Sequence, residues 1–130
     1  MLGAGWTSYI MQAALAYMLV EPSYRAQVSR ARDVYRHRRE LLSRALLQNG
    51  ISTSNRDGLS LWIPVGNERD ALIALAAYGI NASPGSRFML RPYPGQYIRA
   101  ATSRLDADHE ALAAAIASAA NLKGPLSGHV

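Results

Sequence analysis

The sequence predicts an α/β fold of the two-layer α+β kind: a small sheet of about three or four short strands with helices on one face, preceded by a long helix. Apolar residues recur at helical spacing over residues 24–48 and at strand-like spacing after Gly50. A chain of 130 residues can bury one hydrophobic core but hardly two. We therefore expect a single domain over residues 1–122 and a disordered tail over residues 123–130.

The first apolar segment, residues 6–20, reads WTSYIMQAALAYMLV and is nonpolar on nearly every side. It is about 15 residues long, whereas a membrane span needs roughly 20, and no basic stretch precedes it as in a signal peptide. Both readings are therefore weak, and we predict instead a helix that is buried or lies at an interface. Pro22 then suits the first turn of a second helix.

A long helix is predicted over residues 24–48, ending at Asn49-Gly50 because glycine tolerates the left-handed conformation after a helix. Its apolar stripe consists of Tyr24, Val28, Ala31, Tyr35, Leu42, Ala45 and Leu46. From Arg25 to Arg44 seven arginines are opposed by two acidic residues, which equals the formal charge of +5 of the whole chain. We interpret these arginines as a solvated helix face with some interface arginines. Nucleic-acid binding is the weaker alternative, since no aromatic interleaving or helix-turn-helix pattern accompanies them.

Beyond Gly50 two strand-like runs, residues 51–54 and 59–65, flank a polar turn that contains Asp57-Gly58. This pattern predicts a β-hairpin, whose second strand ends at Pro64 or lies at a sheet edge because proline cannot donate to a ladder. Asn67 is predicted to cap the helix that follows. The apolar side of that helix would comprise Ala71, Leu72, Leu75, Ala76 and Tyr78, with Gly79 at its end.

The remaining elements are shorter. Residues 80–82 predict a short strand, residues 83–86 a plain turn or a backbone loop close to a ligand, and residues 97–102 the last strand. Residues 87–96, rich in arginine, proline and tyrosine, are predicted to be a loop. The final helix would begin near Asp106, with Ser103 or Asp106 as its cap, and would bury Leu112, Ala115, Ile116 and Ala119.

The composition restricts the chemistry of the chain. It has no cysteine, which excludes disulfides and thiolate nucleophiles, and its one lysine, Lys123, leaves Schiff-base chemistry nearly excluded. His37, His109 and His129 are far apart and lack the spacing of metal ligands. No P-loop, GxGxxG or HExxH motif is present. We therefore expect no catalytic residue and no metal site within these residues.

Arg99 is the candidate binding residue. It lies in a strand of otherwise apolar or small residues, where a buried guanidinium is costly unless it meets an anion, ideally a carboxylate. The residues equally allow an alternative, in which the strand lies at a sheet edge and Arg99 points into water.

The order of the motifs resembles a known family. The segments RDVYRHRREL, LQNGIS, DGLSLWIPV, YGINASPGSRFM and YIRAATSRLD look like the C-terminal small domain of fold-type I, pyridoxal-phosphate-dependent aminotransferases. Among these proteins the chain most resembles the aminotransferase-like half of MocR-type transcription regulators of the GntR superfamily, and then aromatic and aminoadipate aminotransferases. The resemblance covers residues 6–121.

The resemblance implies roles for particular residues. Arg99 would bind the α-carboxylate of an amino-acid-like effector or substrate, and Pro84, Gly85 and Phe88 would border the cleft. Other matched positions are Gly58, Leu59 and Trp62 of a hairpin motif, and Tyr35, Arg38 and Arg39 of a helix signature that is structural in the family. Ala100 and Ala101 depart from the leucine and serine usual after the arginine, so the shape of the carboxylate site stays open.

The resemblance also implies a larger protein. In the family, the lysine that binds pyridoxal phosphate lies in a large domain upstream, and regulators add a winged-helix domain that binds DNA; Lys123 does not match that lysine. We expect a cytoplasmic, dimeric regulator that binds pyridoxal phosphate or an amino-acid-like effector, with residues 1–20 as an interface helix. The alternative is a genuine aminotransferase. In either case, this chain alone is expected to bind no cofactor and to catalyse no reaction.

Overall fold

The computed structural model describes residues 8–54, 58–103 and 108–123. The chain divides into two compact units, Met1–Val34 and Tyr35–Val130. Within the described part of the chain, every helix is too short or too polar to span a membrane.

The first unit holds helix α1 (Tyr9–Val20) and the beginning of helix α2 (Pro22–Gln48). Pro22 starts α2, as predicted, because the first turn of a helix has no use for the missing N–H. Tyr17 and Tyr24 meet edge to face, with ring centroids 6.5 Å apart. No residue of α1 is buried, so the prediction of a buried helix is wrong for the described chain, whereas the interface prediction stays open.

The second unit begins within α2, whose last turns supply Leu42, Ala45 and Leu46 to the core. In the first unit Val28 of the predicted stripe is 55% exposed, so the apolar face of α2 is used mainly at its C-terminal end. The helix ends as predicted. Gly50 has a φ of 81°, which lets the N–H of Ile51 donate to the carbonyl of Leu46 at 2.9 Å.

Three antiparallel strands form the sheet, in the order β1-β3-β2. They are β1 (Ser60–Val65), β2 (Ser83–Pro84) and β3 (Gln96–Ala101). Strand β1 contains Pro64 and lies at an edge, as predicted. Strand β3 carries Arg99 and is central, so the edge-strand reading of Arg99 is wrong.

Two strand predictions are wrong. Residues 51–54 form no strand, and β1 pairs with β3 instead of forming a hairpin; Asp57, in the predicted turn, lies outside the described residues. Residues 80–82 form no strand either. Strand β2 occupies Ser83–Pro84, where a turn was predicted, and a 3₁₀ turn, η1 (Gly85–Phe88), follows it. Pairing with β3, which is distant in sequence, overrides the local pattern in both places.

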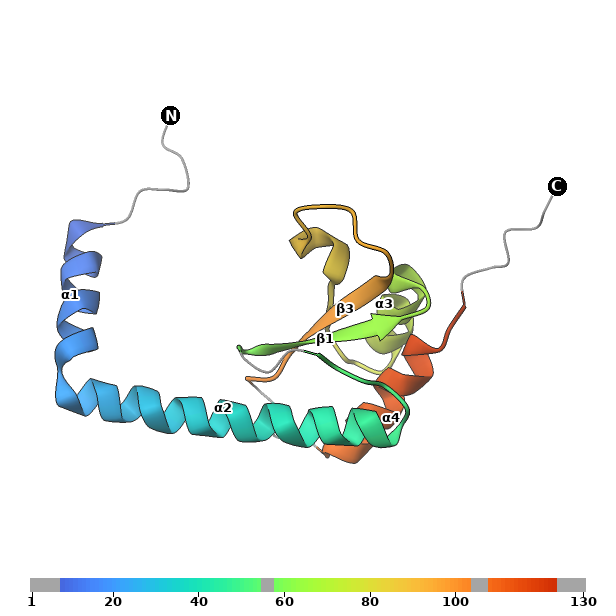
Figure 1. Cartoon of the computed structure of the whole chain (residues 1–130), viewed down its shortest axis with the longest axis horizontal. Helices are drawn as coiled ribbons and strands as arrows, with labels where there is room; N and C mark the ends of the chain where they lie inside the picture. The colour runs from blue at the N-terminus through green and yellow to red at the C-terminus, as the bar shows by residue number, and fades with distance from the viewer. Residues whose placement is uncertain (1–7, 55–57, 104–107, 124–130) are drawn as a thin grey trace. The chain divides into compact units, whose positions relative to one another are not determined.

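Helices α3 (Glu68–Ala77) and α4 (His109–Ala120) cover one face of the sheet (Figure 1). Asn67 caps α3, as predicted, by accepting the N–H of Asp70 at 2.9 Å. Helix α4 is capped by Asp108 and not by Ser103; Asp106, the other predicted cap, lies outside the described residues. The predicted two-layer α+β architecture is confirmed.

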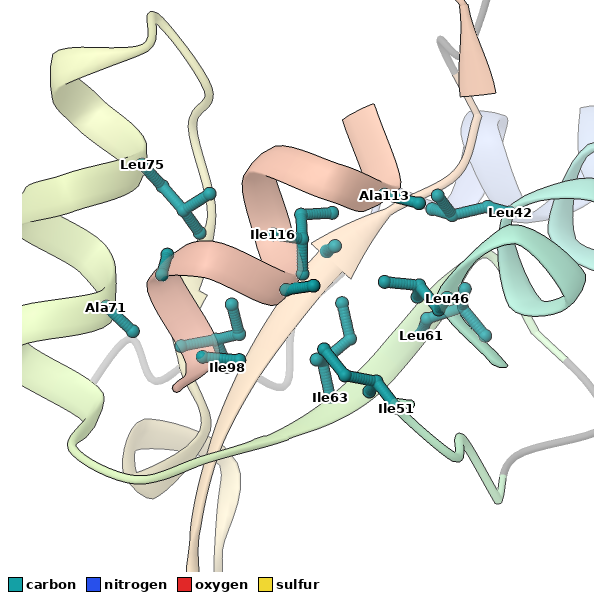
Figure 2. Packing of buried hydrophobic residues seen from close by; sticks show 14 of the residues in the cluster. Leu42, Leu46, Ile51, Leu61, Ile63, Ala71, Leu75, Ile98, Ala113 and Ile116 are labelled. Atoms are coloured by element: carbon teal, nitrogen blue, oxygen red, sulfur yellow. The ribbon is translucent and has the colours of Figure 1, made fainter. Parts of the chain in front are cut away.

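The core lies between the sheet and the helices (Figure 2). Its largest members are Leu42, Leu46, Leu61, Ile63, Leu75, Ile98 and Ile116. Helix α3 buries Ala71 and Leu75 but leaves Ala76 and Tyr78 of its predicted apolar side exposed. Helix α4 buries Ala113, Ile116, Ala117, Ala119 and Ala120, whereas the predicted Leu112 and Ala115 are half-buried. Residues 124–130 of the predicted tail lie outside the described residues.

Two arginines of α2 are bound within the fold. Arg39 is 8% exposed, and its Nη1 donates to the carbonyl of Gly58 at 2.7 Å. Arg38 is half-buried and donates to the carbonyl of Ser103 at 2.6 Å. Both contacts agree with the structural role that the resemblance implies for Arg38 and Arg39, because a guanidinium has enough donors to hold backbone carbonyls. The exposed arginines of the run are Arg25, Arg30, Arg32, Arg36 and Arg44.

Candidate functional site

Arg99 lies on the face of the sheet that the helices leave open. In β3 the buried residues Ile98 and Ala100 alternate with the half-buried Tyr97 and Arg99. Successive residues of a strand point to opposite faces, so Arg99 points away from the core. Its cross-strand neighbours on that outer face are Trp62 of β1 and Ser83 of β2.

Phe88 packs on the guanidinium of Arg99. The Cζ atom of Arg99 is 4.6 Å from the centre of the Phe88 ring, within the range of a cation–π contact. Phe88 belongs to η1, the gold turn that Figure 1 shows beside β3. Among the described residues, Arg99 forms no ion pair with a carboxylate. The structure thus brings together Arg99 and Phe88, two residues that the sequence analysis named.

Aromatic rings continue from Phe88 across the outer face. Phe88 and Tyr97 each meet Trp62 edge to face, with ring centroids 6.4 Å apart in both pairs. Tyr97 meets Tyr93 in the same manner at 5.7 Å. Edge-to-face contacts of this kind stabilise the relative orientation of the rings. Together Trp62, Phe88, Tyr93 and Tyr97 form an aromatic row that begins at Arg99.

A hollow of about 340 Å³ opens beside this row. It is lined by Ser54, Trp62, Met89, Leu90, Arg91, Tyr93 and Tyr97. Ligand pockets usually have volumes of roughly 300–1,000 Å³ and a mostly apolar lining with a few polar groups, so this hollow is small but of the right character. We refer to it as the aromatic pocket.

Pro84 and Gly85 lie against β3 and do not line the aromatic pocket. Pro84 pairs with Ile98 of the central strand. Gly85 is buried, and a Cβ atom at that position would stand 2.5 Å from the carbonyl oxygen of Tyr97. The backbone of η1 at Gly85 therefore approaches strand β3 closely, and only glycine fits there without a shift.

Glu68 holds η1 in place. Its carboxylate accepts the backbone N–H of Ser86 at 2.9 Å and the hydroxyl of Ser86 at 2.6 Å. The backbone N–H of Glu68 in turn donates to Oε1 of Gln96 at 2.6 Å. These bonds join the starts of α3, η1 and β3, and so they position Phe88 over Arg99. Sequence analysis assigned no such role to Glu68, because its partners are distant in sequence.

The hydroxyl groups of Tyr93 and Tyr97 are close enough to interact. Partial burial raises the pKa of the Tyr97 phenol above its ordinary value of 10.0, and the hydrogen bond and charge of Tyr93 raise it further. At neutral pH Tyr97 is therefore protonated, and a neutral phenol lines the aromatic pocket.

Sequence analysis missed most of the aromatic row. Trp62 was noted within a motif, but Tyr93 and Tyr97 received no role. The spacing of Tyr97 and Arg99, two residues apart in a strand, could have placed them on one face. The position of Trp62 opposite Arg99 depends on the register between β1 and β3, and no local pattern reveals this register.

Comparison with known proteins shows a sequence similarity to a transcriptional repressor. No family model and no solved structure matches it. Over 121 residues the chain is 32% identical to PtsJ, the vitamin B6 salvage pathway transcriptional repressor of Salmonella typhimurium. The match covers 92% of this chain, but the chain spans only 28% of the length of that repressor. The chain is thus similar to one segment of a transcriptional repressor.

Proposed function

We propose that this chain is the C-terminal small-domain segment of a MocR-type transcription regulator, in which it closes one side of an effector cleft. The observation that carries the regulator role is the 32% identity to a transcriptional repressor over nearly the whole chain. Because the chain spans 28% of that repressor, we assign DNA binding, dimerisation and most of the cofactor contacts to parts of the protein outside these residues. A regulator of this kind would act in the cytoplasm.

Arg99 is the proposed anchor for the carboxylate of an amino-acid-like effector. Its place on a central strand holds the backbone, and the Phe88 ring restricts the guanidinium from one side. A guanidinium and a carboxylate can form two parallel hydrogen bonds, which gives both affinity and orientation. The outer face of the sheet supplies the charge, while a domain outside these residues would supply the opposite wall of the cleft.

The residues of this chain do not fit covalently bound pyridoxal phosphate. The one lysine, Lys123, is exposed and follows α4, which belongs to the helical layer, whereas Arg99 lies on the opposite face of the sheet. The name of the repressor refers to vitamin B6 salvage. We therefore propose that pyridoxal phosphate, as cofactor or as effector, is bound in the longer protein by residues outside this chain.

The test uses the longer protein that contains these residues. We expect Arg99→Gln to weaken binding of the amino-acid effector by about 1.5–3 kcal/mol, as for a lost charge-assisted hydrogen bond, which is roughly a 10- to 150-fold loss of affinity. Isothermal calorimetry with a panel of amino acids measures this loss. Arg69→Gln, at an exposed position of α3, is the matched control and should leave the affinity unchanged. Equal affinities for Arg99→Gln and the unaltered protein would overturn the assignment.

Two further measurements separate this proposal from its alternatives. Turnover of an amino acid with a keto acid by the longer protein, without any DNA binding, would identify a genuine aminotransferase. Salt-dependent DNA binding by the 130-residue chain itself would point instead to the exposed arginines of α2 as a nucleic-acid surface. We expect a flat DNA titration of this chain at low salt.

A further inference from the structure

We propose that the aromatic pocket selects a ligand with a flat aromatic ring, so that the outer face of the sheet recognises an aromatic carboxylic acid. The inference rests on the proposed function, since it takes Arg99 as the carboxylate anchor. The effector would be an aromatic acid, and Trp62, Tyr93 and Tyr97 would contact its ring.

The rings of the aromatic row are partly exposed to solvent and do not form a second hydrophobic core. Phe88 is 45% exposed and Tyr93 is 60% exposed, although both rings contact other rings. Clustered apolar surface that is left in water is typical of a binding site, whereas isolated exposed apolar residues are ordinary. The rings are held in place by their edge-to-face contacts, so a ligand ring would find them already oriented.

The geometry lets one small molecule use both Arg99 and the pocket. Trp62 lies directly opposite Arg99 in the register of β1 and β3, and directly opposed residues have Cβ atoms about 4.5–5.5 Å apart. Trp62 also lines the aromatic pocket. A carboxylate on Arg99 and a ring on Trp62 are therefore within reach of a short linker of one or two carbons.

The volume and charge of the pocket restrict the ligand further. About 340 Å³ is near the lower limit for ligand pockets, which fits a single ring system better than a long chain. Arg91 lines the pocket and adds a second positive charge. The carboxylate of Glu68, at the start of α3, already accepts two hydrogen bonds from Ser86 of the nearby η1. The local charge thus favours an acid over an amine.

Three small probes test the inference on the 130-residue chain: phenylpropionate, hexanoate and phenylethylamine. Binding is followed by two-dimensional NMR, with the tyrosine and tryptophan ring signals as reporters. We expect phenylpropionate to bind about tenfold more tightly than hexanoate, which lacks the ring, and to shift the signals of Trp62 and Tyr93. Phenylethylamine, which has the ring but the opposite charge, should bind more weakly than both.

Two variants distinguish the ring contact from the anchor. Tyr93→Ala should weaken phenylpropionate binding about two- to tenfold and leave hexanoate binding unchanged, since an aromatic pair stabilises binding beyond the area that it buries. Arg99→Gln should weaken both acids. Tyr78→Ala is the matched control, because Tyr78 is an exposed tyrosine at the end of α3 and outside the pocket. Unchanged amide signals of α4 would show that each variant is folded.

The outcomes separate this inference from the proposed function. If both acids bind equally and both depend on Arg99, the ring pocket is wrong while the carboxylate anchor stands. If phenylpropionate binding depends on Tyr93 but not on Arg99, the anchor is wrong, and with it the assignment of an acid. If millimolar phenylpropionate shifts none of the ring signals, the aromatic pocket of this chain does not bind aromatic acids and the inference is wrong.

Discussion

The guanidinium of Arg99 and the ring of Phe88 are in contact across two elements, with 4.6 Å between Cζ and the ring centre. Phe88 belongs to η1 and Arg99 to β3, and the bonds between Glu68 and Ser86 hold η1 at the start of α3. The contacts of Phe88 and Glu68, which lie outside β3, thus help to orient the guanidinium of the proposed anchor.

We expect Phe88→Ala in the longer protein to weaken effector binding about two- to fivefold, because a cation–π contact at a partly exposed site contributes roughly 0.5–1 kcal/mol. Calorimetric titration with the same effector measures the loss. Phe88→Tyr keeps the ring and should retain the affinity. If Phe88→Ala binds as tightly as the unaltered protein, the ring does not position Arg99.

Arg39 should matter for stability and not for binding. Arg39→Ala removes the charge-assisted hydrogen bond that this buried side chain donates to the carbonyl of Gly58. We therefore expect a decrease of about 1.5–3 kcal/mol in the free energy of unfolding. Urea unfolding of the 130-residue chain measures it. Arg44→Ala, on an exposed part of the same helix, should change stability by about 0.5 kcal/mol or less. Equal losses in the two variants would contradict the structure.

The raised pKa of Tyr97 makes a specific prediction for alkaline pH. The unfolded phenol ionises near pH 10.0, while the folded one ionises at higher pH. Above pH 10 the unfolded state therefore releases its proton first, and this contribution to stability, complete below pH 10, is lost as the pH rises through the folded pKa. Urea unfolding of Tyr97→Phe should show a smaller decrease above pH 10 than the unaltered chain. Tyr78→Phe should match the unaltered chain, and an identical pH profile for Tyr97→Phe would refute the assignment.

Helix α1 predicts self-association of the isolated chain. Its exposed large residues include Tyr9, Ile10, Met11, Tyr17, Leu19 and Val20, and the described chain buries none of them. A surface of this kind tends to associate with another apolar surface. Sedimentation velocity should show oligomers whose fraction rises with concentration, and Ile10→Glu with Leu19→Glu should reduce them. A single monomeric species at high concentration would contradict the interface prediction.

Local signals predicted the helix boundaries well. Pro22, Gly50, Asn67 and Gly79 all mark helix ends where the structure has them. Each of these residues acts on backbone groups within a few positions, so its neighbours in sequence are sufficient to interpret it. The cap of α4 was misplaced because several acidic residues lie close together there.

Strand pairing and the aromatic row could not be predicted in this way. The sequence by itself determined the two-layer α+β class, most helix ends, and Arg99 as the charged residue of an apolar strand. The tertiary structure alone decided that β3 is central, that Phe88 covers Arg99, and that Trp62, Tyr93 and Tyr97 line one pocket. The physical reason is the sequence separation of the interacting residues. Helix caps and apolar periodicity depend on residues within a turn or two, whereas strand register depends on pairing between residues that are far apart in the chain.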